Sequence, residues 1–153
     1  MNRIKIFCIL LLILNSCGFQ KINTNLEKYG FNEINIEGDK KLTYILNNRL
    51  NYLIDQNGDG KFNLYINLKS NKEIKIKDIS GKATRYNLTN SANVEIKNLK
   101  NQNVIKKNFT VSQDYEVATN YSDTIFNEKN IIQNNINKLS EDITKYLQLV
   151  ALN

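Results

Sequence analysis

The sequence predicts an α+β fold, a two-layer sandwich in which a four-stranded, mostly antiparallel sheet carries two helices on one face. Three long segments after residue 61 alternate apolar and polar residues, which is typical of half-buried strands. Two other segments repeat apolar residues at three- and four-residue spacing, which is typical of amphipathic helices. The order is strand, helix, three strands, helix, and each element has one apolar side. Placing both helices on one face of the sheet buries all of these sides.

The first strand and the first helix follow each other directly in the chain. Phe31 to Glu37 forms the strand, with Ile34 and Ile36 at alternating positions. Gly38-Asp39 then starts the helix, and we expect Asp39 to be its N-cap. The apolar face of this helix is formed by Leu42, Ile45, Leu46, Leu50, Leu53 and Ile54. Asn57-Gly58 provides the expected C-terminal signal.

The three long strands are predicted from residue parity. The first two place their apolar residues at even positions: Phe62, Leu64, Ile66, Leu68, Ile74 and Ile76, then Tyr86, Leu88, Ala92, Val94 and Ile96. The polar stretch Ser70 to Lys72 leaves this phase unchanged, which favours one long strand that can carry a bulge over two separate hairpin arms. We therefore expect the even-numbered residues of both strands to be buried. Turns are expected at Ser80-Gly81 and at Asn101 to Asn103.

The third long strand and the terminal helix complete the predicted domain, residues 31–153. The strand alternates Ile105, Phe109, Val111, Tyr115 and Val117. The helix carries one apolar stripe, formed by Ile125, Ile132, Ile136, Leu139, Ile143, Leu147 and Val150. Ser122 or Asp123 is its expected N-cap. No internal repeat or second domain is apparent, and 153 residues suffice for one domain with its own core.

The first 16 residues read as a lipoprotein signal peptide. Arg3 and Lys5 supply the positive start, and the apolar run of residues 6–14 is too short to span a bilayer as a helix. A small residue, Ser16, stands directly before Cys17, as a lipoprotein signal peptidase requires. We expect Cys17 to become the first mature residue and to carry covalent S-diacylglycerol and N-acyl groups, with residues 17–30 as a lipidated tether. The alternative is an ordinary secretory signal that is cut elsewhere.

Basic residues are concentrated in the long strands. Residues 61–110 contain eleven basic and three acidic residues, although the whole chain has 21 and 15. Several of the basic residues have the parity opposite to the predicted core, so they could form one cationic surface for phosphates. These candidates are Lys69, Lys75, Lys77, Lys82, Arg85, Lys97 and Lys106. The alternative is that the lysines only keep an exposed sheet face soluble and protect its edges.

The sequence gives little support for catalysis or metal binding. The chain has no histidine, and its two cysteines are Cys8 in the apolar signal and Cys17, so the usual zinc sites and nucleophile pairs are missing. No paired acids stand out, so we expect no catalytic activity, cofactor or metal. Asp55 to Gly60 resembles the first half of an EF-hand loop, but Ile66 occupies the position of the bidentate glutamate. A polar helix-to-strand turn is favoured over a calcium site there.

Together these features resemble the lipopolysaccharide-assembly lipoprotein family, LptE, over most of the mature chain. Cys17-Gly18-Phe19 is similar to the mature N-terminus of the family, and the order of elements is the same. The run from Ala83 to Leu88, ATRYNL, resembles the start of a long strand in the family. The segment from Phe109 to Tyr115, followed by Tyr121-Ser122-Asp123 and a long helix, is also similar.

The resemblance implies a function in the outer membrane. Members of the family plug a large β-barrel partner, LptD, assist its assembly and bind lipopolysaccharide on its way to the outer leaflet, and they are not enzymes. In the family, basic residues around the long strands contact the substrate, so the resemblance favours lipopolysaccharide binding by Lys75, Lys77, Arg85, Lys97 and Lys106, with Lys69 and Lys82 peripheral. The expected location is the periplasmic side of the outer membrane, lipid-anchored, without nucleic acid. Two alternatives remain: an accessory or pilotin lipoprotein of another envelope complex, or a small calcium-dependent module.

Overall fold

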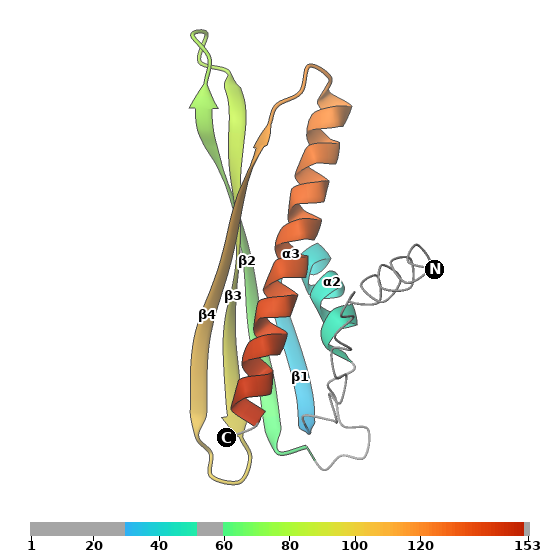
Figure 1. The fold of residues 1–153 in the computed structure, drawn as a ribbon, viewed down its shortest axis with the longest axis vertical. Helices are drawn as coiled ribbons and strands as arrows, with labels where there is room; N and C mark the ends of the chain where they lie inside the picture. The colour runs from blue at the N-terminus through green and yellow to red at the C-terminus, as the bar shows by residue number, and fades with distance from the viewer. Residues whose placement is uncertain (1–29, 52–59, 152–153) are drawn as a thin grey trace, which may run out of the picture.

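The computed structural model describes residues 30–51 and 60–151, which form a two-layer α+β sandwich (Figure 1). The elements run in the order β1 (Phe31–Gly38), α2 (Lys40–Leu50), β2 (Phe62–Lys77), β3 (Ala83–Asn98), β4 (Val104–Glu116) and α3 (Tyr121–Ala151). The sheet order is β1-β2-β3-β4; β1 is parallel to β2, and the other neighbours are antiparallel. This confirms the predicted fold class and order of elements.

The junction between β1 and α2 forms as the sequence predicts. Gly38 has a positive φ of 119°, and a Cβ atom there would lie 2.1 Å from the carbonyl oxygen of Leu68, so only glycine fits. The Asp39 carboxylate accepts hydrogen bonds from the backbone N–H groups of Lys41 (2.9 Å) and Leu42 (3.2 Å), which confirms it as the N-cap. The predicted helix end at Asn57-Gly58, with Leu53 and Ile54, lies outside the described residues.

Strands β2 and β3 form one long hairpin. The polar stretch Ser70 to Lys72 lies within a single 16-residue strand, as expected, and the register shifts that mark a bulge occur around Ile76. In the turn, the Asp78 carboxylate accepts hydrogen bonds from the backbone N–H groups of Ser80 (2.8 Å) and Lys82 (2.9 Å), and Gly81 has a φ of 83°. We call this end of the sandwich, which also holds the N-terminus of α3, the distal end. The opposite end, with the β3–β4 turn and the C-terminus of α3, is the proximal end (Figure 1).

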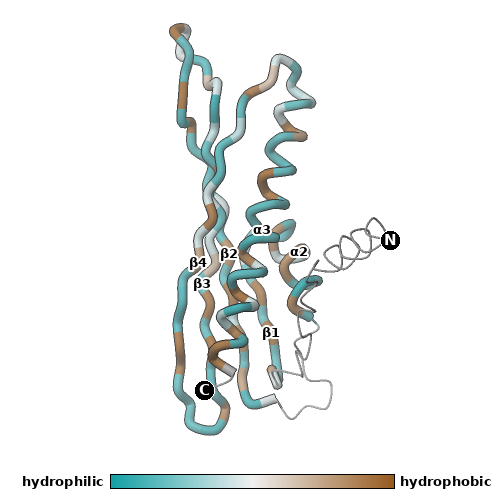
Figure 2. Tube along the Cα trace, in the orientation of Figure 1, coloured by the Kyte–Doolittle hydropathy of each residue, from teal (hydrophilic) through white to brown (hydrophobic). Residues whose placement is uncertain are grey.

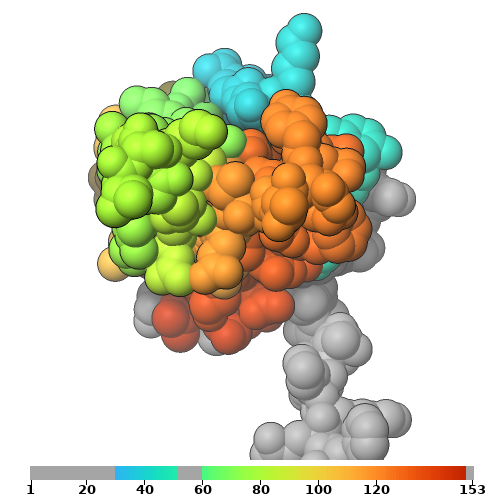
Figure 3. Space-filling view, turned by 90° about the horizontal axis from the view of Figure 1, so that it is seen from above, coloured from blue at the N-terminus to red at the C-terminus, as the bar shows by residue number. Residues whose placement is uncertain are grey.

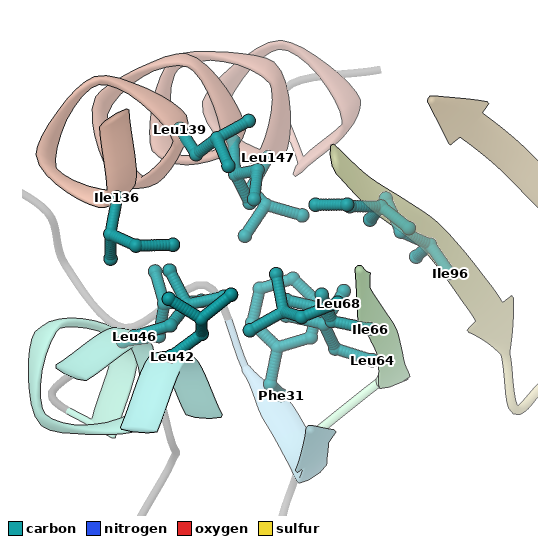
Figure 4. Close-up of a cluster of buried hydrophobic side chains, with 14 residues drawn as sticks. Phe31, Leu42, Leu46, Leu64, Ile66, Leu68, Ile96, Ile136, Leu139 and Leu147 are labelled. Atoms are coloured by element: carbon teal, nitrogen blue, oxygen red, sulfur yellow. The ribbon is translucent and has the colours of Figure 1, made fainter. Parts of the chain in front are cut away.

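The hydrophobic core occupies the proximal half of the sandwich (Figure 4). Its fully buried members include Leu64, Ile66 and Leu68 of β2, Ala92, Val94 and Ile96 of β3, Leu42, Leu46 and Leu50 of α2, and Ile136, Leu139, Ile143 and Leu147 of α3. The expected burial of even-numbered residues is therefore confirmed for this half of the hairpin. None of the helices in the described residues has both the length and the hydropathy that crossing a membrane requires.

Burial of the even positions does not continue to the distal end of β2, although Leu88 of β3 is still buried as predicted. Ile74 and Ile76 are 48% and 44% exposed, so the prediction was wrong for both residues. Strand β1 ends at Gly38, opposite Leu68, and therefore does not accompany this part of β2. Figure 1 shows the hairpin tip and the N-terminal end of α3 diverging, so no helix covers the tip.

The start of α3 also differs from the prediction. The helix begins at Tyr121, and the backbone N–H of Thr124 donates to the carbonyl oxygen of Asn120 (3.2 Å). Asn120 therefore precedes the first turn, while Ser122 and Asp123, the expected caps, lie within it. The Asp123 carboxylate accepts a hydrogen bond from the Asn120 side chain (3.3 Å) and stays near the positive end of the helix dipole.

Candidate functional site

The predicted basic residues of the outer sheet face, the face away from the helices, are partly neutralised by carboxylates. Lys75 forms an ion pair with Asp114, and Arg85 forms one with Glu116 (2.5 Å). At the proximal end, Lys106 pairs with Glu95 (2.8 Å). Hydrogen bonds from Asn87 and then from Lys75 hold the pKa of the Asp114 carboxyl below its usual range.

These residues also lie at two ends of the sheet rather than on one surface. Arg85 and Lys97 are twelve residues apart on β3, which corresponds to about 40 Å along an extended strand. The distal group consists of Lys75, Lys77, Lys82 and Arg85, whereas Lys97 and Lys106 are proximal and Lys69 lies between them. Within the described residues, Lys69, Lys77, Lys82 and Lys97 form no ion pair. As far as the structure is described, the distal end therefore carries two ammonium groups without an ion pair, on Lys77 and Lys82.

Lys72 belongs to the distal end as well, and sequence analysis missed it. It points to the helix side of β2, where its ammonium group lies 2.6 Å from the Glu128 carboxylate of α3 and 4.4 Å from the centre of the Tyr86 ring. Tyr86 stacks on Tyr115 with ring centroids 5.6 Å apart, and the Tyr115 hydroxyl donates to Glu128 (2.7 Å). This four-residue set, Lys72, Tyr86, Tyr115 and Glu128, is named the Lys72 cluster below.

Contacts within the Lys72 cluster keep Lys72 and Glu128 in their charged forms. Partial burial disfavours the charged form of Lys72, but the hydrogen bonds and charge of Glu128, together with Tyr115, raise the pKa of the lysine overall. Burial likewise opposes ionisation of Glu128, while the hydrogen bonds from Lys72 and Tyr115 lower the pKa of that carboxyl overall. Partial burial raises the pKa of the Tyr115 hydroxyl, which therefore remains a donor at neutral pH.

A cleft of about 470 Å³ opens beside this cluster, between the hairpin and the start of α3. Figure 3, which looks onto the distal end, shows the hairpin tip and the N-terminus of α3 side by side. Lys72, Lys82 and Glu128 supply the charged groups of the cleft, and Tyr86, Val117, Tyr121 and Ile125 are among its apolar and aromatic lining. Figure 2 shows hydrophobic residues at the tip itself, where Ile79 is fully exposed. The cleft thus combines ammonium groups with apolar walls.

A buried polar layer separates the cleft from the hydrophobic core. Asn90 and Asn135 are both fully buried, and the Asn135 amide donates to Asn90 (2.9 Å) and to the carbonyl oxygen of Leu88 (3.2 Å). The Asn90 amide donates in turn to the Ser70 hydroxyl (3.0 Å). The Asn135 side-chain oxygen has no hydrogen-bond partner among the described residues. Helix α3 therefore packs on the sheet through apolar contacts proximally and through polar contacts distally.

Two predicted sites fall outside the described residues. Cys17, the expected lipidation site, precedes residue 30. Of the calcium-like motif, residues 55–59 are likewise outside the described ranges and only Gly60 is inside. Within the described ranges, no cluster of three or more acidic, histidine or cysteine residues could hold a metal ion.

The fold is shared with solved bacterial lipoproteins. The structure of rare lipoprotein B from Shewanella oneidensis matches with a TM-score of 0.61 at 11% identity, covering 79% of this chain and 97% of that one. The structure of an uncharacterized lipoprotein B from Nitrosomonas europaea matches with a TM-score of 0.60 at 11% identity, covering 86% and 89%. No protein-family model and no curated protein matches the sequence. At such low identity these similarities show a common fold.

Proposed function

We propose that this protein is an outer-membrane lipoprotein that plugs an LptD-like β-barrel, assists its assembly and binds lipopolysaccharide during transport to the outer leaflet. Residues 1–16 would be removed as the signal peptide, and acyl chains on Cys17 would anchor the protein on the periplasmic side through the tether of residues 17–30. The proposal includes no catalytic activity. The anchor is supported by the signal-like sequence and by the fold shared with two proteins described as lipoproteins.

The observation that carries the proposal is the chemistry of the distal end. Lipopolysaccharide presents phosphate groups next to acyl chains, so its binding site needs cations beside apolar surface. Lys75, Lys77 and Arg85 lie near the hairpin tip, and Lys82 lies at the mouth of the cleft with the aromatic lining. The proximal end also has a cleft between sheet and helix, of about 320 Å³, but its lining includes neither Lys97 nor Lys106 nor any other cation. We therefore assign the phosphates to the distal end first.

The existing ion pairs limit the affinity that we expect of this site for lipopolysaccharide. Each exposed charge contact contributes only roughly 0.2–1 kcal/mol, so no single substitution need abolish binding. Phosphates would have to compete with Asp114 and Glu116 for Lys75 and Arg85, whereas Lys77 and Lys82 are free of ion pairs within the described residues. The site therefore depends on several cations acting together.

The test compares two triple variants of equal charge change. The distal variant is Lys75→Glu, Lys77→Glu, Arg85→Glu, and the control is Lys61→Glu, Lys100→Glu, Lys107→Glu at the proximal end. All six residues lie outside the core, so both variants should remain folded by circular dichroism. Binding of lipopolysaccharide should be lost in the distal variant and kept in the control.

Wild-type binding should also weaken as salt rises, because exposed charges are screened. If the folded distal variant binds lipopolysaccharide as well as the control does, the distal cations serve only solubility. Lipopolysaccharide binding would then have to be removed from the proposed function.

A further inference from the structure

The outer sheet face also has a hollow, far from the distal cleft. It has a volume of about 410 Å³ and lies across all four strands near the proximal end. Tyr65 of β2 and the side chains of Asn35, Asn67, Asn93 and Asn108 line it, one asparagine from each strand. In the register of the sheet, Asn67 is opposite Asn93, which is opposite Asn108. Four strands at their usual spacing span about 14 Å, so the asparagines border an extended surface.

The asparagine side chains in this hollow have no hydrogen-bond partners within the described residues. The neighbouring polar residues of the same face behave differently. The Thr89 hydroxyl donates to Asn87 (3.0 Å), the Ser112 hydroxyl donates to Asn87 (2.9 Å), and the Asn87 amide donates to Asp114 (2.7 Å). The polar groups farther along the face therefore satisfy one another, while the amides around the hollow keep their donors and acceptors available.

Tyr65 adds an oriented aromatic ring to this surface. The side chain is 36% exposed on the outer face. Its hydroxyl accepts a hydrogen bond from the Asn63 amide (3.3 Å). The Asn63 side-chain oxygen in turn accepts a hydrogen bond from the Asn32 amide (3.1 Å). These contacts fix the ring before any ligand arrives, which lowers the entropic cost of binding.

The hollow carries no net positive charge. The carboxylates of Glu37 and Glu95 and the ammonium group of Lys106 border it, and Glu95 and Lys106 pair with each other at 2.8 Å. Lys107 is opposite the buried Val94 and therefore points to the helix side of the sheet. An anionic ligand therefore gains no overall attraction here. The apolar surface of a protein partner would meet a row of hydrated amides that it could not satisfy.

We infer that this hollow binds a neutral oligosaccharide. Sugar hydroxyls donate and accept hydrogen bonds at close spacing, as the amides of Asn67, Asn93 and Asn108 do. The apolar C–H face of a sugar ring can lie on the exposed Tyr65 ring, and the Glu95–Lys106 pair offers a charged acceptor beside a charged donor. The inference does not rest on the proposed function, since it involves different residues at the other end of the sheet.

The test measures binding of three oligosaccharides to the full chain in detergent micelles by isothermal titration calorimetry. The probes are maltohexaose, an N-acetylglucosamine hexamer, and the deacylated, dephosphorylated core saccharide of lipopolysaccharide, which separate free hexose, N-acetylated and lipid-derived sources. At least one should bind saturably. Tyr65→Ala and Asn93→Ala should each weaken that binding by about tenfold or more.

Asn71→Ala is the matched control, because Asn71 is an exposed asparagine on the same strand as Tyr65 but outside the hollow, and it should change the affinity by less than about twofold. The distal triple-glutamate variant should also bind sugar normally, which separates this site from the lipopolysaccharide site. The inference is overturned if no probe binds saturably, or if the folded Tyr65→Ala and Asn93→Ala variants bind as tightly as wild type.

Discussion

Replacing Lys72 with methionine removes the ammonium group of the Lys72 cluster while keeping an unbranched side chain of similar length. The ammonium group makes two kinds of contact, the 2.6 Å ion pair with Glu128 and the approach to the Tyr86 ring at 4.4 Å. The two side chains of the ion pair are 38% and 24% exposed, so solvent screening keeps its contribution to roughly 0.2–1 kcal/mol. A cation–π contact at such a position contributes roughly 0.5–1 kcal/mol.

The expected loss of folding free energy for Lys72→Met is therefore about 1–2 kcal/mol. Urea unfolding followed by circular dichroism measures it. Lys69→Met is the matched control: Lys69 is on the same strand, points to the outer face and has no ion pair within the described residues, so its loss should stay within about 0.5 kcal/mol. The reasoning fails if Lys72→Met is as mild as Lys69→Met.

A double-mutant cycle with Glu128→Gln isolates the pairwise term, which should be about 0.5–1 kcal/mol. Its pH dependence follows from the pKa shifts. The pKa of Glu128 is lowered from 4.5, so this stabilisation is present above pH 4.5 and is lost as pH falls through the folded pKa. The pKa of Lys72 is raised from 10.5. The stabilisation that depends on the charged lysine is therefore present below pH 10.5 and is lost as pH rises through the pKa of Lys72 in the folded protein. A coupling that is equal at pH 7 and at pH 2 would contradict the assignment.

Three further predictions concern the anchor, the cap and the core boundary. Cys17→Ser should abolish metabolic labelling with palmitate, and label that persists in the variant would exclude Cys17 as the lipidation site. Asp39→Ala should lower the free energy of unfolding by about 0.5–2 kcal/mol in urea titrations, because two backbone N–H groups lose their acceptor. Ile66→Asp and Val94→Asp should each cost several kcal/mol because they bury a charge, whereas Ile74→Asp should cost less than about 1 kcal/mol because Ile74 is half exposed. Equal losses for all three aspartate variants in the same titrations would contradict the observed core boundary.

Much of the fold could be predicted because local signals agreed with long-range packing. Even-position alternation identified the buried face of the proximal hairpin, and Gly38-Asp39 identified the start of α2. The exposure of Ile74 and Ile76 could not be predicted in this way. The parity of Ile74 is correct, but its burial depends on where β1 ends relative to β2. Ile76 lies beyond a register shift and pairs with Arg85, a residue of the outer face. Both effects are properties of strand pairing rather than of the local sequence.

The candidate site was less predictable for a related reason. Counting charges by segment assigned Lys75 and Arg85 to a basic region, while Asp114 and Glu116 belonged to a later segment that pairs with it across the sheet. In the sequence, Lys72 interrupts the apolar pattern. Its even position was the available signal that it points toward the helices, but its partner Glu128 is 56 residues away.

The most direct test of the central claim is the identity of the protein that copurifies with this chain from cell envelopes. Affinity purification under mild detergent, followed by mass spectrometry, should recover an LptD-like β-barrel in near-equal amount. The distal triple-glutamate variant should recover the same barrel, because these residues are assigned to lipopolysaccharide rather than to the barrel. Recovery of a different envelope complex instead of a barrel would contradict the account and would favour an accessory or pilotin role.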